Sequence, residues 1–251
     1  MKFTEVRAFP RPDLTYYLTW KISENLSNVS FTIYRSENPK MDEDVYTVAT
    51  VVDQYYYLDD ESYRFHRNYK LYYRIKAILG NNEVWSDVFY SDYTISPEVK
   101  FIYKEDSFFL RKYIDDPIQI FLKKWSGPTC SNCYDLIKER QIRQSCSNCY
   151  GTGIQGGYYG PFHSYWQRGL RPEAILLAPE TKLRIVAGNA AWTLNFPPIS
   201  PDDIIYCVRE GLIYKANRIT KPAFKGYPVR QHLEELVALP LDSPEYLLVR
   251  K

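Results

Sequence analysis

The chain has 251 residues, a net charge of +2 and 25% charged residues, so no strong field directs it to nucleic acid or to a membrane surface. Its length allows two ordinary domains, and its 45% of hydrophobic residues can form real cores. The sequence shows no apolar run of about 18 residues and no signal-peptide pattern at its start, so we expect no membrane partner.

Short alternating stretches rich in β-branched and aromatic residues fill the first hundred residues. They predict strands at 14–22, 29–35, 46–52, 55–58, 69–79 and 84–90. Turn signals such as Ser36-Glu37-Asn38-Pro39 and Gly80-Asn81-Asn82 separate them. Six or seven strands in about ninety residues predict an antiparallel sandwich.

Three stretches of this region carry a family resemblance: Trp20 in an early strand, residues 31–35 (FTIYR), and the alternating run from Leu71 to Ala77. With them, residues 1–95 resemble a fibronectin type III domain. The resemblance implies that Trp20 packs between two sheets and that the domain is a spacer or binding surface without catalysis. This chain departs from the family at Leu71, where a tyrosine usually stands six residues before the alanine.

The residues after the sandwich predict a boundary, a helix and a strand. Residues 91–99 are polar and contain Pro97, which indicates a linker. Residues 105–114 begin with acidic residues, end with basic ones and are followed by Pro117, a pattern typical of a short helix. Residues 118–125 (IQIFLKKW) then predict a strand that leads into a cysteine pair.

Two CxxC pairs lie twelve residues apart, Cys130 with Cys133 and Cys146 with Cys149. This spacing can place four thiolates around one ion, and four cysteines leave no open position for catalysis. We therefore predict a structural zinc ribbon at 126–160, in which Gly151 and Gly153 take positive φ where the backbone passes close to sulfur. Four free thiols or two disulfides are the alternative. The chain shows no secretion signal, and this favours metal.

The remaining residues predict more strands, at 174–178, 183–187, 204–208 and 212–219, with a hairpin tip at 221–226. Residues 229–239 fit a strand or one or two helical turns. Cys207 lies in an apolar run, so we predict that it is a buried core residue. The fold class is therefore mainly β, with the N-terminal sandwich followed, over residues 96–251, by a small β-barrel that carries the inserted ribbon.

No sequence motif in the chain indicates a particular enzyme activity. Gly151, Gly153 and Gly156 match the dinucleotide fingerprint in form, but they follow a cysteine pair instead of a strand and cannot open a helix. The histidines are His66, His163 and His232. His163, fourteen residues after Cys149, could approach the metal, but a surface or packing role is the stronger interpretation. We predict that the protein is not an enzyme.

The cysteine region, with CxxCYD, CxxCYGTG and GGYY within residues 121–162, resembles structural proteins in the neck or tail of tailed bacteriophages. Residues 192–205 and 229–231 extend the resemblance more loosely. It implies a virion protein, made in the bacterial host cytoplasm, that forms a homo-oligomeric ring at the head-to-tail neck and contacts portal, adaptor or tail subunits. The 24 tyrosines suit such contacts. A baseplate or other tail position stays open.

A nucleic-acid-binding zinc protein is the second hypothesis. Basic residues surround the ribbon, and Trp125 and Tyr150 could stack on bases. The basic residues are Lys123, Lys124, Lys138, Arg140 and Arg143. Asp135 and Glu139 offset part of this charge, so the excess is modest and nucleic acid is not the expected main partner.

Overall fold

A computed structural model describes residues 1–62, 70–91, 95–135, 140–141, 146–169 and 190–249. The chain forms two compact units. The first comprises residues 1–95 with 125–142 and 153–155, and the second comprises residues 96–124, 143–152 and 156–251. Among the described residues, no helix is both long and apolar enough to cross a membrane.

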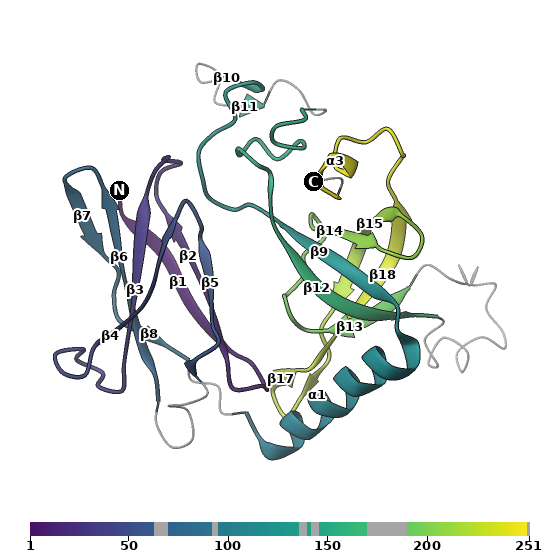
Figure 1. The fold of residues 1–251 in the computed structure, drawn as a ribbon, viewed down its shortest axis with the longest axis horizontal. Coiled ribbons are helices and arrows are strands. Elements are labelled where there is room, and N and C mark those ends of the chain that lie inside the picture. Colours follow the sequence, from purple (N-terminus) through teal and green to yellow (C-terminus); the bar gives the residue numbers. More distant parts are fainter. Residues whose placement is uncertain (63–69, 92–94, 136–139, 142–145, 170–189, 250–251) are drawn as a thin grey trace. The chain divides into compact units, whose positions relative to one another are not determined.

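The first unit contains two antiparallel sheets (Figure 1). One sheet has the order β1-β2-β5, with β1 at Phe3–Pro10, β2 at Tyr16–Ile22 and β5 at Tyr56–Asp59. The other has the order β4-β3-β6-β7, with β4 at Tyr46–Val52, β3 at Ser30–Ser36, β6 at Tyr72–Leu79 and β7 at Asn82–Trp85. The short β8, Phe89–Tyr90, also pairs with β6.

Side chains from the two sheets meet in one core. The Trp20 ring of β2 is buried and lies 5.4 Å from the Phe31 ring of β3, as expected for a tryptophan between sheets. A buried ion pair crosses the same space, because Arg35 Nη1 lies 2.7 Å from Asp59 Oδ2. The Tyr73 hydroxyl donates to the same carboxylate at 2.9 Å, so Asp59 has both a charge partner and a hydrogen bond.

The expected strands of this unit are present, with two differences. β1 was missed, although Val6 and Ala8 alternate with Glu5 and Arg7 as in a half-buried strand. The single strand expected at 84–90 is two strands, β7 and β8. Between them the Ser86 hydroxyl accepts the backbone N–H of Ile75 at 2.9 Å, so a side chain takes the place of a ladder carbonyl.

The second unit is built on a closed antiparallel barrel of six strands, in the order β12-β13-β18-β15-β14-β9. The strands are β9 Pro117–Lys123, β12 Tyr158–Arg168, β13 Ala191–Leu194, β14 Ile204–Cys207, β15 Leu212–Thr220 and β18 Arg230–Ala238. The predicted small barrel is thus confirmed. Closure leaves none of these strands as a sheet edge.

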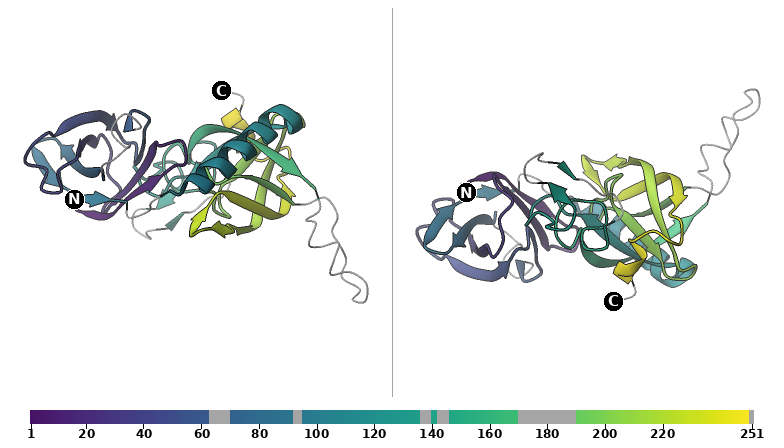
Figure 2. Two further views of the ribbon diagram at one scale, coloured as in Figure 1. Left: turned by 90° about the horizontal axis from the view of Figure 1, so that it is seen from below. Right: turned by 90° about the horizontal axis from the view of Figure 1, so that it is seen from above.

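The helix of this unit begins eight residues earlier than predicted. α1 spans Pro97–Phe109 and continues as a wider helical turn, η2, over Leu110–Ile114. The reason is local: Ser96 Oγ accepts the Val99 N–H at 3.3 Å, and Pro97 occupies the first helical turn, where its fixed φ is favourable. Pro97 therefore starts a helix, and the two units divide just before it, between Ile95 and Ser96, within the predicted boundary stretch. Figures 1 and 2 show α1 along the outside of the barrel.

Other expectations for the second unit had mixed outcomes. β12 was missed, since its first residues read as an irregular glycine-rich connection, and β13 was missed as well. Residues 229–239 form a strand, β18, and the tip at 221–226 is a hairpin of β16 (Ala223–Phe224) and β17 (Tyr227–Pro228). The strands expected at 174–178 and 183–187 lie outside the described residues. A short helix, α3, Tyr246–Val249, follows β18.

Candidate metal centre

The four cysteines of the two CxxC pairs come together. The Sγ atoms of Cys130, Cys133, Cys146 and Cys149 all lie within 4.8 Å of one another, and all four residues are buried. A tetrahedral zinc site has zinc–sulfur distances of about 2.3 Å and so needs sulfur atoms about 3.8 Å apart. No sulfur–sulfur distance in the cluster exceeds that spacing by more than about 1 Å. Sulfur-only donors in this arrangement suit zinc or another thiophilic metal ion.

The alternative of two disulfides does not hold. None of the five cysteines, all of which belong to the described part of the chain, forms a disulfide. Hydrophobic burial alone does not explain why four thiols lie together, because each thiol could be buried equally well against apolar carbon atoms. A shared metal ion would account for the convergence, and the four residues are placed so that they could bind one.

The turn at the second pair holds its sulfur atoms by backbone hydrogen bonds. The Tyr150 N–H donates to the Cys146 carbonyl at 2.7 Å, and the Thr152 N–H donates to the Cys149 carbonyl at 2.9 Å. The Thr152 hydroxyl donates to the same Cys149 oxygen at 2.7 Å. Gly151 and Gly153 have φ values of 78° and 80°, so the prediction that they take positive φ is confirmed.

The first pair lies on a chain segment that runs beside the end of the second turn. The Cys130 N–H donates to the Gly153 carbonyl at 2.8 Å, and the Gln155 N–H donates to the Pro128 carbonyl at 2.8 Å. A short hairpin of β10 (Tyr134–Asp135) and β11 (Arg140–Gln141) follows Cys133. The whole insertion, residues 124–157, leaves the barrel after β9 and returns as β12, which pairs with β9.

Gly157 supports the site in a way that the spacing does not reveal. Its φ is +63°, and a Cβ added there would lie 2.6 Å from the Cys149 carbonyl oxygen and 2.8 Å from Tyr150 Cδ2. Only glycine allows the chain to pass so close to the cysteine turn. Two adjacent glycines, Gly156 and Gly157, were visible in the sequence, but the contact that requires the second one is a tertiary contact.

The turn is also fixed to the core of the barrel through one aromatic side chain. Tyr150 follows Cys149 and is buried, with φ of 50°. It belongs to a hydrophobic cluster near one end of the barrel. The other buried members are Phe121, Tyr158, Ile204, Ile213 and Tyr246. Tyr150 was proposed as a base-stacking residue, but its burial in this cluster gives it a packing role.

Asp203 is a second supporting residue, placed where β9 leaves the barrel toward the cysteines. Its carboxylate accepts the Lys123 N–H at 2.6 Å and the Ser200 N–H at 2.7 Å. Burial nevertheless raises the pKa of Asp203 to about 6, because desolvation outweighs the two backbone hydrogen bonds. The Ser200 contact is local, three residues away in the chain, whereas the Lys123 contact joins Asp203 to the end of β9.

The histidines and basic residues named from the sequence take other places. His163 is exposed on β12, His232 lies on β18, and His66 is outside the described residues. Lys123 Nζ pairs with Asp202 at 3.0 Å, and Lys124 Nζ lies 5.5 Å from the centre of the Tyr159 ring. Lys138 and Arg143 are outside the described residues, and Arg140 lies in β11.

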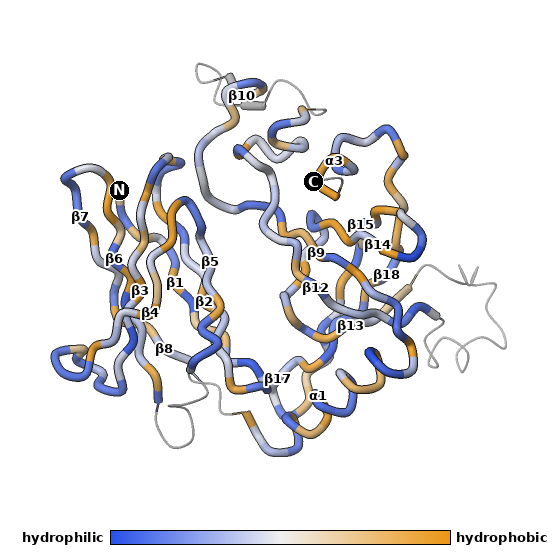
Figure 3. The backbone as a smooth tube through the Cα atoms, in the orientation of Figure 1, coloured by the Kyte–Doolittle hydropathy of each residue, from blue (hydrophilic) through white to orange (hydrophobic). Residues whose placement is uncertain are grey.

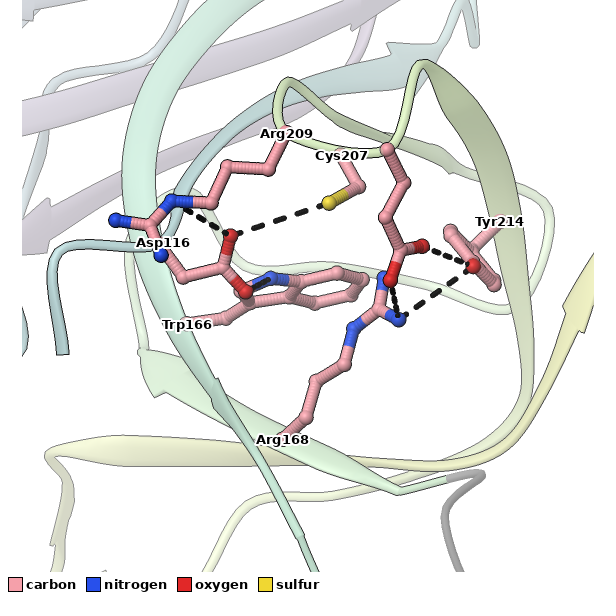
Figure 4. A network of polar contacts seen from close by, with 7 residues as sticks. Asp116, Trp166, Arg168, Cys207, Arg209 and Tyr214 are labelled. Atoms are coloured by element: carbon pink, nitrogen blue, oxygen red, sulfur yellow. Dashed lines mark hydrogen bonds and ion pairs between the residues drawn. The ribbon is translucent and has the colours of Figure 1, made fainter.

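Cys207 does not belong to the cysteine group but to a polar network elsewhere on the barrel (Figure 4). Its Sγ lies 3.9 Å from Asp116 Oδ1, while Trp166 Nε1 donates to Asp116 Oδ2 at 2.7 Å. The Arg168 guanidinium lies over the Trp166 and Tyr214 rings, 4.3 Å and 4.6 Å from their centres. Cys207 is buried, as predicted, and burial raises the pKa of its thiol, so the thiol stays protonated.

Comparisons of the chain with protein-family models, with curated protein sequences and with solved structures found no match.

Proposed function

We propose that this chain is a non-enzymatic structural component of a tailed-bacteriophage virion, located in the head-to-tail neck as a symmetric ring. The observation that carries the proposal is the four-cysteine cluster in an insertion between β9 and β12 of a closed barrel. The stretch from β9 through the cysteines to β12 is the one whose sequence resembles phage neck and tail proteins. A buried four-thiolate site has no open coordination position, which fits a role in assembly.

The zinc in this proposal replaces a hydrophobic core. Residues 124–157 are too few to bury a core of their own, and metal ligation supplies the missing folding free energy. Cys130, Cys133, Cys146 and Cys149 are the proposed ligands. The ion stabilises the insertion and takes no part in a reaction.

The first unit fits a fibronectin type III-like module on the outside of such a particle. Its strand order, β1-β2-β5 and β4-β3-β6-β7, and the buried Trp20 between the sheets support that assignment. Domains of this kind serve as spacers and binding surfaces. The neighbours in the particle would be portal, adaptor or tail subunits.

Native mass spectrometry of the reduced, purified protein tests the proposal, with labelling of phage particles by an antibody to the chain as the second readout. We expect one zinc per chain, a ring-sized oligomer and label at the neck. Label at the baseplate would change the position and leave the class of protein intact. Absence of the chain from purified particles of the virus that encodes it would refute the proposal.

A further inference from the structure

Each unit has a surface region where exposed apolar side chains lie close in sequence to charged ones. On the second unit the cluster lies on the outer side of α1 and η2, which we call the aromatic helix face. Its members Phe101, Phe108 and Tyr113 have 64%, 54% and 70% of their surface exposed. The ring of Tyr113 contacts that of Phe108 at 5.8 Å, so the two form one patch. Figure 3 shows apolar positions along α1 next to hydrophilic ones.

The aromatic helix face is basic. Glu98 and Asp106, two of the acidic residues of α1, are bound by Lys225 and Arg230 of the same unit, at 2.7 Å and 2.6 Å. α1 has one further carboxylate, Glu105. Among the described residues, no ion pair joins Glu105 to a basic side chain. Four cations stand along the helix: Lys100, Lys104, Arg111 and Lys112. The patch therefore suits an acidic partner with apolar side chains.

The first unit carries a segment of that chemistry. Residues 37–45, between β3 and β4 (Figure 1), together with Tyr46, the first residue of β4, form what we call the acidic loop. It ends in Val45 and Tyr46, which are 42% and 49% exposed. Its charged side chains are four acids and one lysine: Glu37, Lys40, Asp42, Glu43 and Asp44.

The acidic loop is built to hold a defined shape. The Ser36 hydroxyl donates to the Glu43 carbonyl at 3.0 Å and accepts the Asn38 N–H at 2.9 Å. The Asn38 side-chain amide donates to Asp42 at 2.6 Å. An ordered loop loses little conformational entropy when it binds, which favours its use as a contact.

We propose that the acidic loop of one copy of the chain binds the aromatic helix face of a second copy. Carboxylates of the loop would face the cations of the helix, and Val45 and Tyr46 would cover the exposed rings. Because the two surfaces differ, the contact is head-to-tail, which is the type that closes into rings. A nucleic acid would also meet the helix cations, but its phosphates would repel the acidic loop and leave its exposed apolar residues unexplained.

This inference rests on the proposed ring for the number of copies, and it can be tested separately by charge reversal. One variant, Lys104→Glu with Arg111→Glu, reverses the helix face. The other, Glu37→Lys with Glu43→Lys, reverses the loop. It spares Asp44, whose φ is +49°, and Asp42, which accepts a hydrogen bond from Asn38, so that the loop keeps its shape. Lys104→Arg with Arg111→Lys conserves charge and serves as the control.

Sedimentation velocity over a range of protein concentrations, at low and high salt, measures the association. We expect the unmodified chain and the control to associate more strongly at low salt, and each reversed variant to associate at least about tenfold more weakly. An equal mixture of the two reversed variants should regain association. Its oligomers, weighed by native mass spectrometry, should contain both variants in equal numbers, since only unlike copies then attract each other.

An unmodified chain that stays monomeric at every concentration would overturn the inference, as would reversed variants that associate normally or a mixture that does not recover. Thermal melting curves equal to that of the unmodified chain would show that both variants fold. The proposed function fails in a different way: the chain would be missing from particles although the mixture recovers. If the chain is present in particles but charge reversal does not change its oligomers, only this contact is refuted.

Discussion

At the scale of single residues, the cysteine ligands make the first prediction. Replacing Cys146 with serine removes one of four thiolates, so we expect zinc affinity to fall at least about a hundredfold. Competition with a chromophoric chelator measures the change. Cys207→Ala is the matched control, because Cys207 is equally buried but lies beside Asp116, outside the cluster. Equal zinc affinities of the C146S variant and the unmodified chain would contradict the assignment.

Asp203 predicts a pH dependence of stability. Its pKa is raised from 3.8 to about 6 in the folded chain, so the folded state holds the proton more tightly than the unfolded state. The resulting stabilisation is complete below the unfolded pKa and is lost as the pH rises through about 6, a change of roughly 3 kcal/mol. Asp203→Asn should lack this part of the pH dependence.

Urea unfolding at several pH values between about 4 and 7 tests this point. Asp202→Asn is the neighbouring control, since the Asp202 side chain is 73% exposed and pairs with Lys123 at the surface. We expect the D202N variant to keep the pH slope of the unmodified chain. A D203N variant with that same slope would show that another group causes it.

At the scale of elements, the approach of β12 to the cysteine turn depends on Gly157. An alanine there would meet both backbone strain and the Cys149 carbonyl oxygen, so we expect a loss of about 3 kcal/mol or more in unfolding free energy. Gly226→Ala separates the two causes, because Gly226 has φ of +80° but nothing within 4 Å of an added Cβ. That control should lose only about 1 kcal/mol. Chemical denaturation measures both, and equal losses would exclude the contact.

The attachment of α1 to the barrel gives a second prediction for an element. Arg230 of β18 binds Asp106 of α1 through two hydrogen bonds of 2.6 Å, and the Asp106 side chain is only 9% exposed. Arg230→Met would leave this carboxylate buried and unpaired, at a cost of about 3 kcal/mol.

Lys225→Met is the comparison, because the Lys225–Glu98 pair also reaches α1 but both side chains are more than half exposed, at 52% and 54%. We expect that change to cost at most about 0.5 kcal/mol. Thermal or urea denaturation of the two variants decides the matter. If R230M were as stable as K225M, the buried pair would not be what holds the helix.

At the scale of the whole molecule, metal removal should loosen one segment and spare the barrel. The barrel is closed by strand pairs and has its own core, including Ile204 and Ile213, whereas the proposed metal site lies in the insertion. After treatment with a strong chelator under reducing conditions, hydrogen exchange should rise in peptides covering 126–135 and 146–157. Peptides from β14 and β15 should keep their protection. Loss of protection throughout β14 and β15 would mean that the metal supports the barrel as well.

The metal site could be predicted from the sequence to the level of its ligands. Two CxxC pairs at short spacing restrict four thiols to one neighbourhood whatever the rest of the chain does, and the structure brings them within 4.8 Å. Gly157, Tyr150 and Asp203, which hold the site in place, were not predicted in those roles. Their function depends on which distant residues they meet, and no local pattern encodes that.

The same division holds for the fold. Period-two alternation by itself determined that the chain is mainly β. The residues Ser96 and Pro97 are a typical helix start, and α1 does begin there, although the helix was predicted to begin later. Only the tertiary structure decided that β12 passes through Gly160, where the β9 pairing shifts register, and that six strands close into a barrel. Alternation is a property of neighbouring residues, whereas register and closure depend on pairing between residues up to about ninety positions apart, such as Phe121 with Ile204.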